Sequence, residues 1–506
     1  MKRLTYLFLL LFPIGICAQD MYNAIPLFEN DITGTARFVG MGGSMGSLGG
    51  DLSVMGTNPA GIGLYRSNDV SFSFGLDHIM NKADFNGEIT KAQTTDFSIE
   101  NAGFVFSCDI DDSVLKFLNV GIAYRNRNNL AGELDAFNPN GGGFSQQYVM
   151  ADLYNKNRFN WNNLSYTLYE DMNISWLALL GAEAYLGDDE GNRFTKPNGS
   201  LVWNPTYYGY YSEEKGGVDE VDLNVALNLG DRVYLGATVG VQNIDYSRYS
   251  CYDEGDDHGE IYALENRYRM EGQGFDIKLG AIFRPFKYSP FKIGIAFHSP
   301  TWYEYDEYTS ASIRDPYGNI IDTRDYELYD GEVVLRSKLS TPWRLNASMS
   351  YTFGTLLAIN AEYEYADFKN GEFTGASSIA KAQNTEIGYN VKEQHTARIG
   401  AELNVDGFAL RAGYNYITSP FETSAYKDIY NSPVTMTSTE YHNKFEKNIV
   451  TLGCGYRGKS FYFDLAYMFQ KQDSDFYPFY DTEWVNPCAK VDNQKHSVIG
   501  TLGFRF

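Results

Sequence analysis

Along most of the chain, apolar residues alternate with polar or small residues at a period of two. In 116–127, Leu118, Val120, Ile122 and Tyr124 share one face, while small or polar side chains share the other. The same alternation returns in 344–351, 357–365, 397–404 and 410–416. Because successive side chains of a strand point to opposite sides, the pattern predicts strands with one apolar face.

The length of these segments separates two fold classes. Alternation also suits a soluble sandwich that buries one face of each sheet. The segments run to about ten residues or more, which a tilted strand needs to cross a bilayer, whereas soluble strands average about half that. Tyr363, Tyr365, Tyr414 and Tyr416 lie at segment ends, like the aromatic girdles of membrane barrels. A lipid-facing wall must pair every backbone group, so we expect the sheet to close.

Fourteen segments fit this description. They are 70–78, 98–109, 117–126, 218–229, 232–246, 269–284, 290–299, 332–352 (interrupted at Pro342), 356–367, 394–405, 408–418, 447–457, 460–470 and 495–506. Every second connection is a tight turn, as at Gly230-Asp231, Asp406-Gly407 and Gly458-Lys459, and the others are long. Short periplasmic turns and long outer loops are typical of outer-membrane barrels. We therefore predict an all-β protein, a closed 14-stranded antiparallel transmembrane barrel with both termini in the periplasm.

The first residues indicate export. Lys2 and Arg3 precede an apolar run over 4–16, and Ala18 offers a small residue before a cut. We expect a signal peptide over 1–18, cleaved after Ala18. Lipid attachment at Cys17 is the weaker alternative, because Ile16 stands where that processing needs a small residue. The apolar run is too short for a permanent membrane helix.

Charge and cysteine content exclude some partners and frameworks. The net charge of −23 disfavours nucleic acid, because phosphate binding needs a basic surface. Acidic runs such as 253–257 are expected in solvated loops. The expected mature chain keeps Cys108, Cys251, Cys454 and Cys488, too few for a disulfide framework. Cys251 and Cys488 fall in predicted loops and could pair.

The stretch 34–66 before the first strand carries ten glycines and the tetrapeptide Asn58-Pro59-Ala60-Gly61. One interpretation is a flexible linker. The other is a compact plug inside the barrel, where close packing against the wall leaves no room for side chains. A fourteen-stranded barrel is wide enough to hold such an element. We expect residues 19–66 to form a hatch in the lumen and residues 67–506 to form the barrel.

The chain resembles the FadL-type outer-membrane transporters of long-chain fatty acids and other hydrophobic compounds. The resemblance rests on Gly34-Thr35-Ala36-Arg37, the glycine-rich stretch, Asn58-Pro59-Ala60-Gly61, the strand count and Thr341-Pro342-Trp343-Arg344. It covers essentially the whole mature chain and implies a hatch that blocks the lumen, with Asn58, Pro59 and Ala60 within it. It also implies a kinked third strand that opens the wall sideways, although 117–126 shows no clear kink residue.

The long connection 127–217 has apolar residues near helical spacing. They are Leu164, Leu168, Met172, Trp176, Leu177, Leu180 and Ala184. One interpretation is an amphipathic helix that covers the barrel rim. The resemblance implies an outer groove that captures a hydrophobic ligand, with Leu164, Leu168, Met172, Trp176 and Leu180 as the candidate contacts.

Candidate chemistry is sparse, and we expect neither an enzyme nor a cofactor. The six histidines lack metal-ligand spacing, and no nucleophile or phosphate-loop motif occurs. Four arginines point to the predicted lumen and could meet a ligand carboxylate, or pair with lumenal acids such as Glu362, Glu364, Glu402 and Asp464. They are Arg125, Arg344, Arg398 and Arg411.

The predicted function is passive, hatch-gated uptake of hydrophobic compounds such as fatty acids. Its partners are the hydrophobic solute, the outer-membrane lipid and the barrel assembly machinery, for which the apolar C-terminus ending in Phe506 resembles the delivery signal. A barrel hydrolase, a structural or adhesive barrel and an open porin are alternatives. A hydrolase needs a nucleophile with a partnered base, and an open porin needs no hatch.

Overall fold

The protein is described from a computed structural model. It describes residues 20–110, 114–141, 144–157, 168–169, 171, 173–184, 186, 201–325, 332–375, 377–481 and 486–506. Within these residues, nineteen strands join in one sheet. They are β1 (Asp69–Phe85), β2 (Glu88–Asp109), β3 (Leu115–Asn129), β4 (Gly132–Asn138), β5 (Tyr207–Leu229), β6 (Val233–Asp256), β7 (Gly259–Phe283), β8 (Lys292–His298), β9 (Trp302–Arg314), β10 (Ile320–Asp322), β11 (Val333–Ser340), β12 (Arg344–Phe353), β13 (Leu357–Asp367), β14 (Glu372–Phe373), β15 (Glu393–Val405), β16 (Phe408–Ile417), β17 (Tyr441–Arg457), β18 (Phe461–Tyr477) and β19 (Ala489–Arg505).

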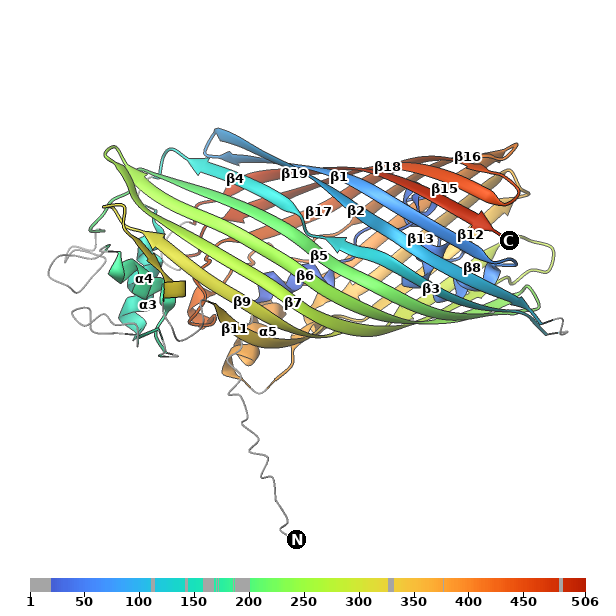
Figure 1. Cartoon of the computed structure of the whole chain (residues 1–506), viewed down its shortest axis with the longest axis horizontal. Helices are drawn as coiled ribbons and strands as arrows, with labels where there is room; N and C mark the ends of the chain where they lie inside the picture. Colours follow the sequence, from blue (N-terminus) through green and yellow to red (C-terminus); the bar gives the residue numbers. More distant parts are fainter. Residues whose placement is uncertain are drawn as a thin grey trace, which may run out of the picture.

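The sheet closes on itself because β1 pairs antiparallel with β19 from Asp69–Arg505 to Asp84–Lys490 (Figure 1). At three positions, two short strands follow one another and together make one strand of the wall. β3 and β4 both pair with β5, and β8 and β9 both pair with β7. β11 pairs with β9, and β12 pairs with β13. The predicted fold class is confirmed: the wall is a closed, fourteen-stranded antiparallel barrel.

The barrel is taller than predicted, and two expected long loops are strand hairpins. Strands β1 and β2 meet at the turn Asn86-Gly87, where both residues have positive φ, and β6 and β7 meet across Asp257-His258. We expected the acidic run at 253–257 to lie in a loop, but most of it lies in β6. These strand ends were missed because they lie beyond the apolar surface band, so their outward positions are polar and the alternation fades.

Strand β9 was also missed, because Pro300 reads as the end of the preceding strand. The proline interrupts one wall strand between β8 and β9, in the way that Pro342 interrupts the next strand between β11 and β12. A proline removes one ladder hydrogen bond but leaves the flanking residues free to pair.

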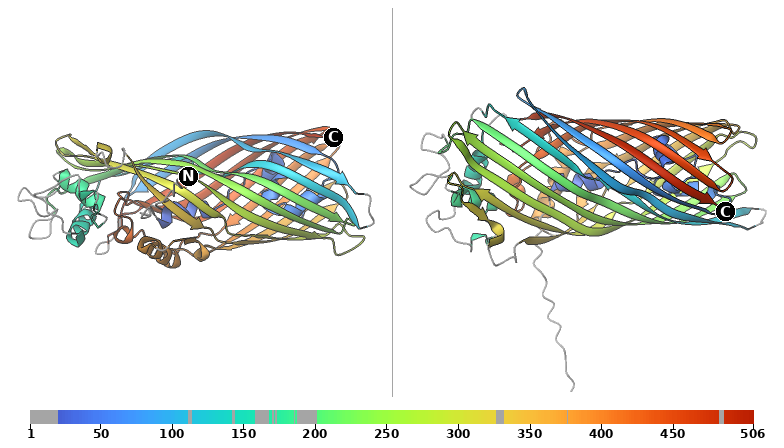
Figure 2. Two further views of the ribbon diagram at one scale, coloured as in Figure 1. Left: turned by 60° about the horizontal axis from the view of Figure 1, so that its bottom comes forward. Right: turned by 45° about the horizontal axis from the view of Figure 1, so that its top comes forward.

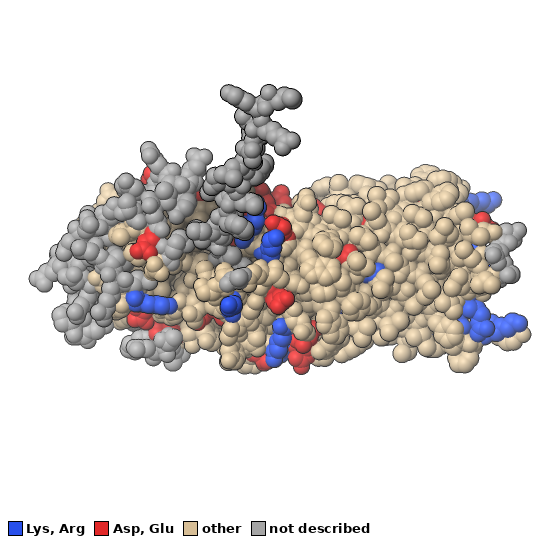
Figure 3. Space-filling view, turned by 90° about the horizontal axis from the view of Figure 1, so that it is seen from below, with Lys and Arg blue, Asp and Glu red and all other residues tan. Residues whose placement is uncertain are grey.

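An apolar band surrounds the outside of the barrel. Outward side chains such as Phe72, Leu76, Val239 and Leu452 are each 44–56% exposed. Figure 3 shows a broad surface with few charges, bounded by Lys and Arg at one end and by mixed charges toward the other. This surface matches the hydrocarbon core of a bilayer. In the described part of the chain, no helix is both long and apolar enough to span a membrane.

The two ends of the barrel differ. The tight turns, Asp69 and the C-terminal strand end lie at one end, here called the turn end, and α3 (Gln146–Asn157), α4 (Trp176–Glu183) and α5 (Ser378–Asn390) lie toward the other, the loop end (Figures 1 and 2). Short 3₁₀ turns η5 (Thr323–Asp325), η7 (Phe368–Asn370) and η8 (Ile429–Asn431) also follow the strands that end there.

The described chain begins toward the loop end, at Asp20, and ends at the turn end, at Phe506, while the side of the membrane on which each terminus lies stays a prediction. Asp20 pairs with Lys427 and Met21 N donates to Gln383 of α5, whereas Phe506 pairs with Asn68 at the turn end. The physical reason is the path of the N-terminal segment, which descends through the lumen before β1 begins.

Candidate functional site: the lumen, its N-terminal segment and the wall seam

Residues 20–66 fold as a compact segment inside the barrel (Figure 1). They form α1 (Met21–Phe28), α2 (Ala36–Gly40), η1 (Leu52–Gly56) and η2 (Pro59–Leu64). Met45, Val54, Ala60 and Ile62 are fully buried, and wall side chains bond the backbone of the segment. Thr501 accepts from Ala36 N at 2.7 Å, and Asn119 donates to Ile62 O at 2.7 Å. The geometry favours the compact interpretation of this stretch over a flexible linker.

Glycines set the fit between this segment and the wall. A β-carbon on Gly40 would lie 3.2 Å from the Cα of Gly453, and one on Gly413 would collide with the backbone nitrogen of Gly42. Gly42 has a φ of +64°, which other residues rarely adopt. Glycine on both sides lets the two backbones approach where a side chain on either would hold them apart.

Asn58 connects two turns of the segment. Its Oδ1 accepts from Ala60 N at 3.2 Å, and its Nδ2 donates to the carbonyl of Gly46 at 2.7 Å. Asn58 caps η2 with Pro59 as the first residue of that turn, and the side chain is fully buried. Gly61 lies against Val54 and Gly49, where a β-carbon would be 2.7 Å from Val54 Cγ2.

Arg37 fastens the segment to the wall, a contact that sequence reasoning missed. Its Nε and Nη2 bind both oxygens of Glu402 on β15 at 2.9 and 3.1 Å. Burial disfavours the charged guanidinium, but Glu402 outweighs burial and raises the pKa of Arg37 above its ordinary value. The only signal in the sequence was one cation in a stretch of small residues, which does not identify its partner.

The four predicted lumenal arginines are all paired with wall carboxylates. Arg344 lies 2.7 Å from Glu364, Arg398 lies 3.0 Å from Glu362, and Arg411 lies 2.6 Å from Asp464. Arg125 pairs with Glu220, which also pairs with Lys278. Each charge is therefore compensated by acids on nearby strands of the wall, so the expected pairing with lumenal acids describes the structure better than a free anion site.

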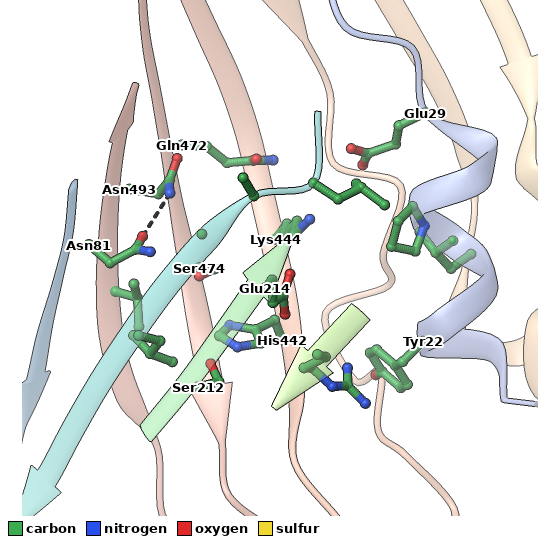
Figure 4. A pocket seen from close by; sticks show the side chains of 18 of the residues that line it. Tyr22, Glu29, Asn81, Ser212, Glu214, His442, Lys444, Gln472, Ser474 and Asn493 are labelled. Carbon is green, nitrogen blue, oxygen red and sulfur yellow. Dashed lines mark hydrogen bonds between the residues drawn. The ribbon is translucent and has the colours of Figure 1, made fainter. Parts of the chain in front are cut away.

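A cavity of about 230 Å³ lies in the lumen beside α1 (Figure 4). Tyr22 and Glu29 border it from the N-terminal segment, while Glu214, His442 and Lys444 project from β5 and β17. Its apolar lining includes Ile25, Pro26, Ile79, Leu130, Ala131, Leu134, Met270, Phe421 and Val491. The cavity is amphipathic, so it can hold a ligand that has both polar and apolar parts.

Two cations of this cavity, Lys444 and Arg248, are less tightly paired than the four arginines, although the carboxylate of Glu214 acts on both. Within the described chain, neither Lys444 nor Arg248 has a carboxylate oxygen within 4.0 Å of its side-chain nitrogens. By contrast, Lys427 is 3.0 Å from Asp20, and Lys495 is 2.9 Å from Asp77. Arg248 lies over the ring of Tyr268 at 5.6 Å.

The backbone ladder of the wall is interrupted between β2 and the β3–β4 strand. The β2–β3 pairing stops at Asn101–Arg125, although β2 itself continues to Glu88 beside β1. In the described residues, β4 pairs with β5 and makes no backbone ladder with β2. We call this interruption, between 88–100 of β2 and 126–138, the seam.

Side chains bridge the seam. Asn129 Nδ2 donates to Asp96 at 2.9 Å and to Asp77 at 3.0 Å, and Thr90 Oγ1 donates to Asp135 O. Outside, Phe97 and Ile99 are 65% and 43% exposed at its edge. Inside, the cavity is lined by 128–133. The seam therefore lies between the lumenal cavity and the outer surface, and only its end at Phe97 and Ile99 reaches the apolar band.

The third strand is irregular at its end toward the loop end, although 117–126 offers no clear kink residue. Its register with β5 shifts between Asn126 and Asn128, and the strand breaks at Leu130–Ala131. Opposite, Gly216 has a φ of +84° and receives the Leu130 N–H. The sequence feature that marks this irregularity is the pair Gly216-Gly217. We interpreted it as the end of a loop, but it lies inside β5.

The predicted loop helix is shorter than its pattern. Helix α4 covers only Trp176–Glu183, and Leu168 lies before it, while Leu164 and Met172 lie outside the described residues. Trp176 is 2% exposed and Leu180 is fully buried in an apolar cluster with β4, β5 and β7. These two side chains stabilise the cap at the loop end; ligand capture by them stays a prediction.

The remaining chemistry is limited. Cys108, Cys251, Cys454 and Cys488 are free thiols, so the possible pair Cys251–Cys488 is not formed. Among the described residues, no group of three or more His, Cys, Asp or Glu side chains could hold a metal ion.

Solved structures share this architecture. One is a FadL homologue of Pseudomonas aeruginosa, with a TM-score of 0.56, 12% identity, and coverage of 94% of this chain and 99% of that chain. Another is the toluene transporter TodX of Pseudomonas putida, with a TM-score of 0.54, 11% identity and the same coverage. No protein-family model and no curated sequence matches the chain. At these identities the likeness establishes the fold.

Proposed function

We propose that this barrel, which shares its fold with a FadL homologue and with TodX, is an outer-membrane channel for passive uptake of hydrophobic compounds. One observation carries the proposal: an amphipathic cavity in a plugged lumen touches a seam that reaches the apolar band at Phe97 and Ile99. A hydrophobic solute that leaves through the seam reaches lipid without crossing the periplasmic water.

The driving force is the transfer of apolar surface from water into lipid, about 25 cal/mol per Å². No coupling to an energy source is needed for movement down such a gradient. Residues 20–66 act as the hatch in this proposal, because an open lumen of this width would also pass ions and polar solutes. The turn end faces the periplasm and the loop end faces outside.

The cavity favours a hydrophobic compound with a polar end, such as a long-chain fatty acid, over a bare hydrocarbon. Lys444 and Arg248 offer charged donors that have no carboxylate oxygen within 4.0 Å in the described chain, and the apolar lining can hold a chain. A bare hydrocarbon would displace water from these groups and leave them unpaired, which costs free energy. The loop-end cap, with α4, is the proposed place of first capture.

Uptake of a labelled fatty acid into liposomes that contain the purified barrel tests this proposal. We expect Lys444→Met to weaken uptake of the fatty acid about tenfold, because a charged hydrogen bond contributes about 1.5–3 kcal/mol. Uptake of an alkane should be unchanged by the same variant. The control is Lys459→Met, which removes an exposed lysine in a tight turn. Equal uptake with and without the barrel would refute the proposed function.

Protease treatment of intact cells tests the orientation. We expect cuts in the connection between β4 and β5, which belongs to the loop end, and none at Gly458-Lys459. Opened cells should show the opposite accessibility at the turn end. Cuts at Gly458-Lys459 in intact cells would reverse the proposed orientation.

A further inference from the structure

The outside of the barrel changes from apolar to charged at partnered positions of neighbouring strands. One row of direct register partners across β5, β6, β7 and β9 is apolar, and its members are 39–50% exposed; they are Val221, Val241, Phe275 and Trp302. From this row toward the loop end, the outward positions of β7, β9 and β11 become charged. The six charged residues nearest the row, here called the charged belt, are Arg269, Glu271, Glu304, Asp306, Arg336 and Lys338.

Each cation that β11 contributes to the belt faces a carboxylate of β9. Arg336 Nε lies 2.9 Å from Asp306 Oδ1, and Lys338 Nζ lies 3.3 Å from Glu304 Oε2. The side chains of Arg336 and Lys338 are 65% and 56% exposed. Exposed ion pairs contribute little to folding stability, because water and salt screen them, so stability does not account for the belt. Figure 3 shows such mixed charges along the border of the broad uncharged surface.

Arg269 is a cation of the belt that is held in one orientation. Its guanidinium carbon lies 3.9 Å from the centroid of the Tyr308 ring, and its nitrogens pair with Glu271 and Glu332. A guanidinium that is stacked on a ring keeps its N–H donors at its edge. Such donors bind two phosphate oxygens at once, which favours phosphate over other anions. The side chain is 38% exposed, so a ligand can reach it from outside.

The position and the charges of the belt together indicate its partner. A surface that borders the apolar band lies where the headgroups of the surrounding lipid begin. The cations of the belt suit phosphate groups, and carboxylates such as Glu304 and Asp306 suit hard divalent cations. A divalent cation can be shared between one carboxylate and a phosphate of the lipid, which avoids repulsion between the two anions.

We propose that the charged belt binds the phosphorylated sugar headgroup of a glycolipid in the outer leaflet, with divalent cations bridging its phosphates to the carboxylates. The choice of leaflet rests on the proposed function, in which the loop end faces outside. Binding at the belt holds lipid against the wall formed by β7, β9 and β11. It does not require the lumen, the hatch or the seam.

The opposite border of the apolar band provides the matched control. Arg232, Lys287 and Lys459 are exposed at the turn end. Within the described chain, none of the three has a carboxylate oxygen within 4.0 Å of its side-chain nitrogens. These cations can attract any anionic headgroup, but they lack the alternation of cations and carboxylates that characterises the belt.

The experiment measures the affinity of fluorescent, bisphosphorylated lipid A for the purified full-length barrel in neutral detergent with Mg²⁺. We expect the triple variant Arg269→Ser, Arg336→Ser, Lys338→Ser to bind it at least about tenfold more weakly, because charge-assisted hydrogen bonds to phosphate are lost. The triple variant Arg232→Ser, Lys287→Ser, Lys459→Ser should bind like the parent. Removal of Mg²⁺ by a chelator, or of the phosphates from lipid A, should also weaken binding to the parent at least about tenfold.

Phosphatidylglycerol distinguishes the glycolipid from any anionic lipid, and we expect it to compete at least about tenfold less well than lipid A. Equal affinity of the belt variant and the parent would overturn the inference, as would an equal loss in the turn-end variant. So would parent protein that binds dephosphorylated lipid A or phosphatidylglycerol as tightly as lipid A, a comparison that needs no variant to fold. The liposome uptake assay contains no glycolipid, so failure of this inference and failure of the proposed transport are separate results.

Discussion

Cells that carry Asn58→Ala or Gly61→Leu are expected to become permeable to ions and to large antibiotics while the barrel still assembles. Asn58→Ala leaves the Gly46 carbonyl and the Ala60 N–H without their partner. An unpaired buried group costs about 1–3 kcal/mol, which loosens residues 20–66. Gly61→Leu places a side chain where even a β-carbon would meet Val54.

Planar-bilayer conductance of the purified variants and antibiotic sensitivity of the cells measure this effect. The wall should keep its stability, because its own strand ladder satisfies its backbone groups. Asn431→Ala is the matched control, since Asn431 is exposed in η8 at the loop end. Parental conductance in both hatch variants would show that these residues do not hold the lumen closed.

Closing the seam covalently is expected to abolish uptake of the hydrophobic compound. Asp96→Cys and Asn129→Cys, in a chain whose four native thiols are replaced by serine, place two thiols where Asn129 Nδ2 and Asp96 Oδ2 are 2.9 Å apart. A short reducible cross-linker should reduce liposome uptake to the level of protein-free liposomes. Reduction of the linker should restore it, because the lumen and the hatch are unchanged.

The control for the cross-link joins a part of the wall that already has a ladder. Ala401 of β15 and Ala412 of β16 are direct partners, and Ala401→Cys with Ala412→Cys carries the same linker without closing any opening. Uptake should be the same before and after reduction of that pair. Full uptake through the cross-linked seam would mean that the solute leaves by another route.

Much of the wall followed from local pattern. The period of two, the tight turns and the length of the segments predicted the closed barrel, because every lipid-facing strand must repeat the same alternation and pair on both sides. Gly230, Asp231, Asp406 and Gly407 have positive φ, as the turns require. The sequence also determined which residues of the N-terminal segment must be small, since only glycine fits against another backbone.

The tertiary structure alone decided the rest. Arg37 and Glu402 lie 365 positions apart, so no local pattern joins them. The sequence did not predict the seam, because Gly216-Gly217 lies inside β5, whereas a pair of glycines commonly ends a strand. The path of residues 20–66 through the lumen, from Asp20 near Lys427 to the start of β1, is likewise set by packing and not by local pattern. Local alternation specifies a strand and its faces; which distant charges meet, and where the ladder opens, depends on closure.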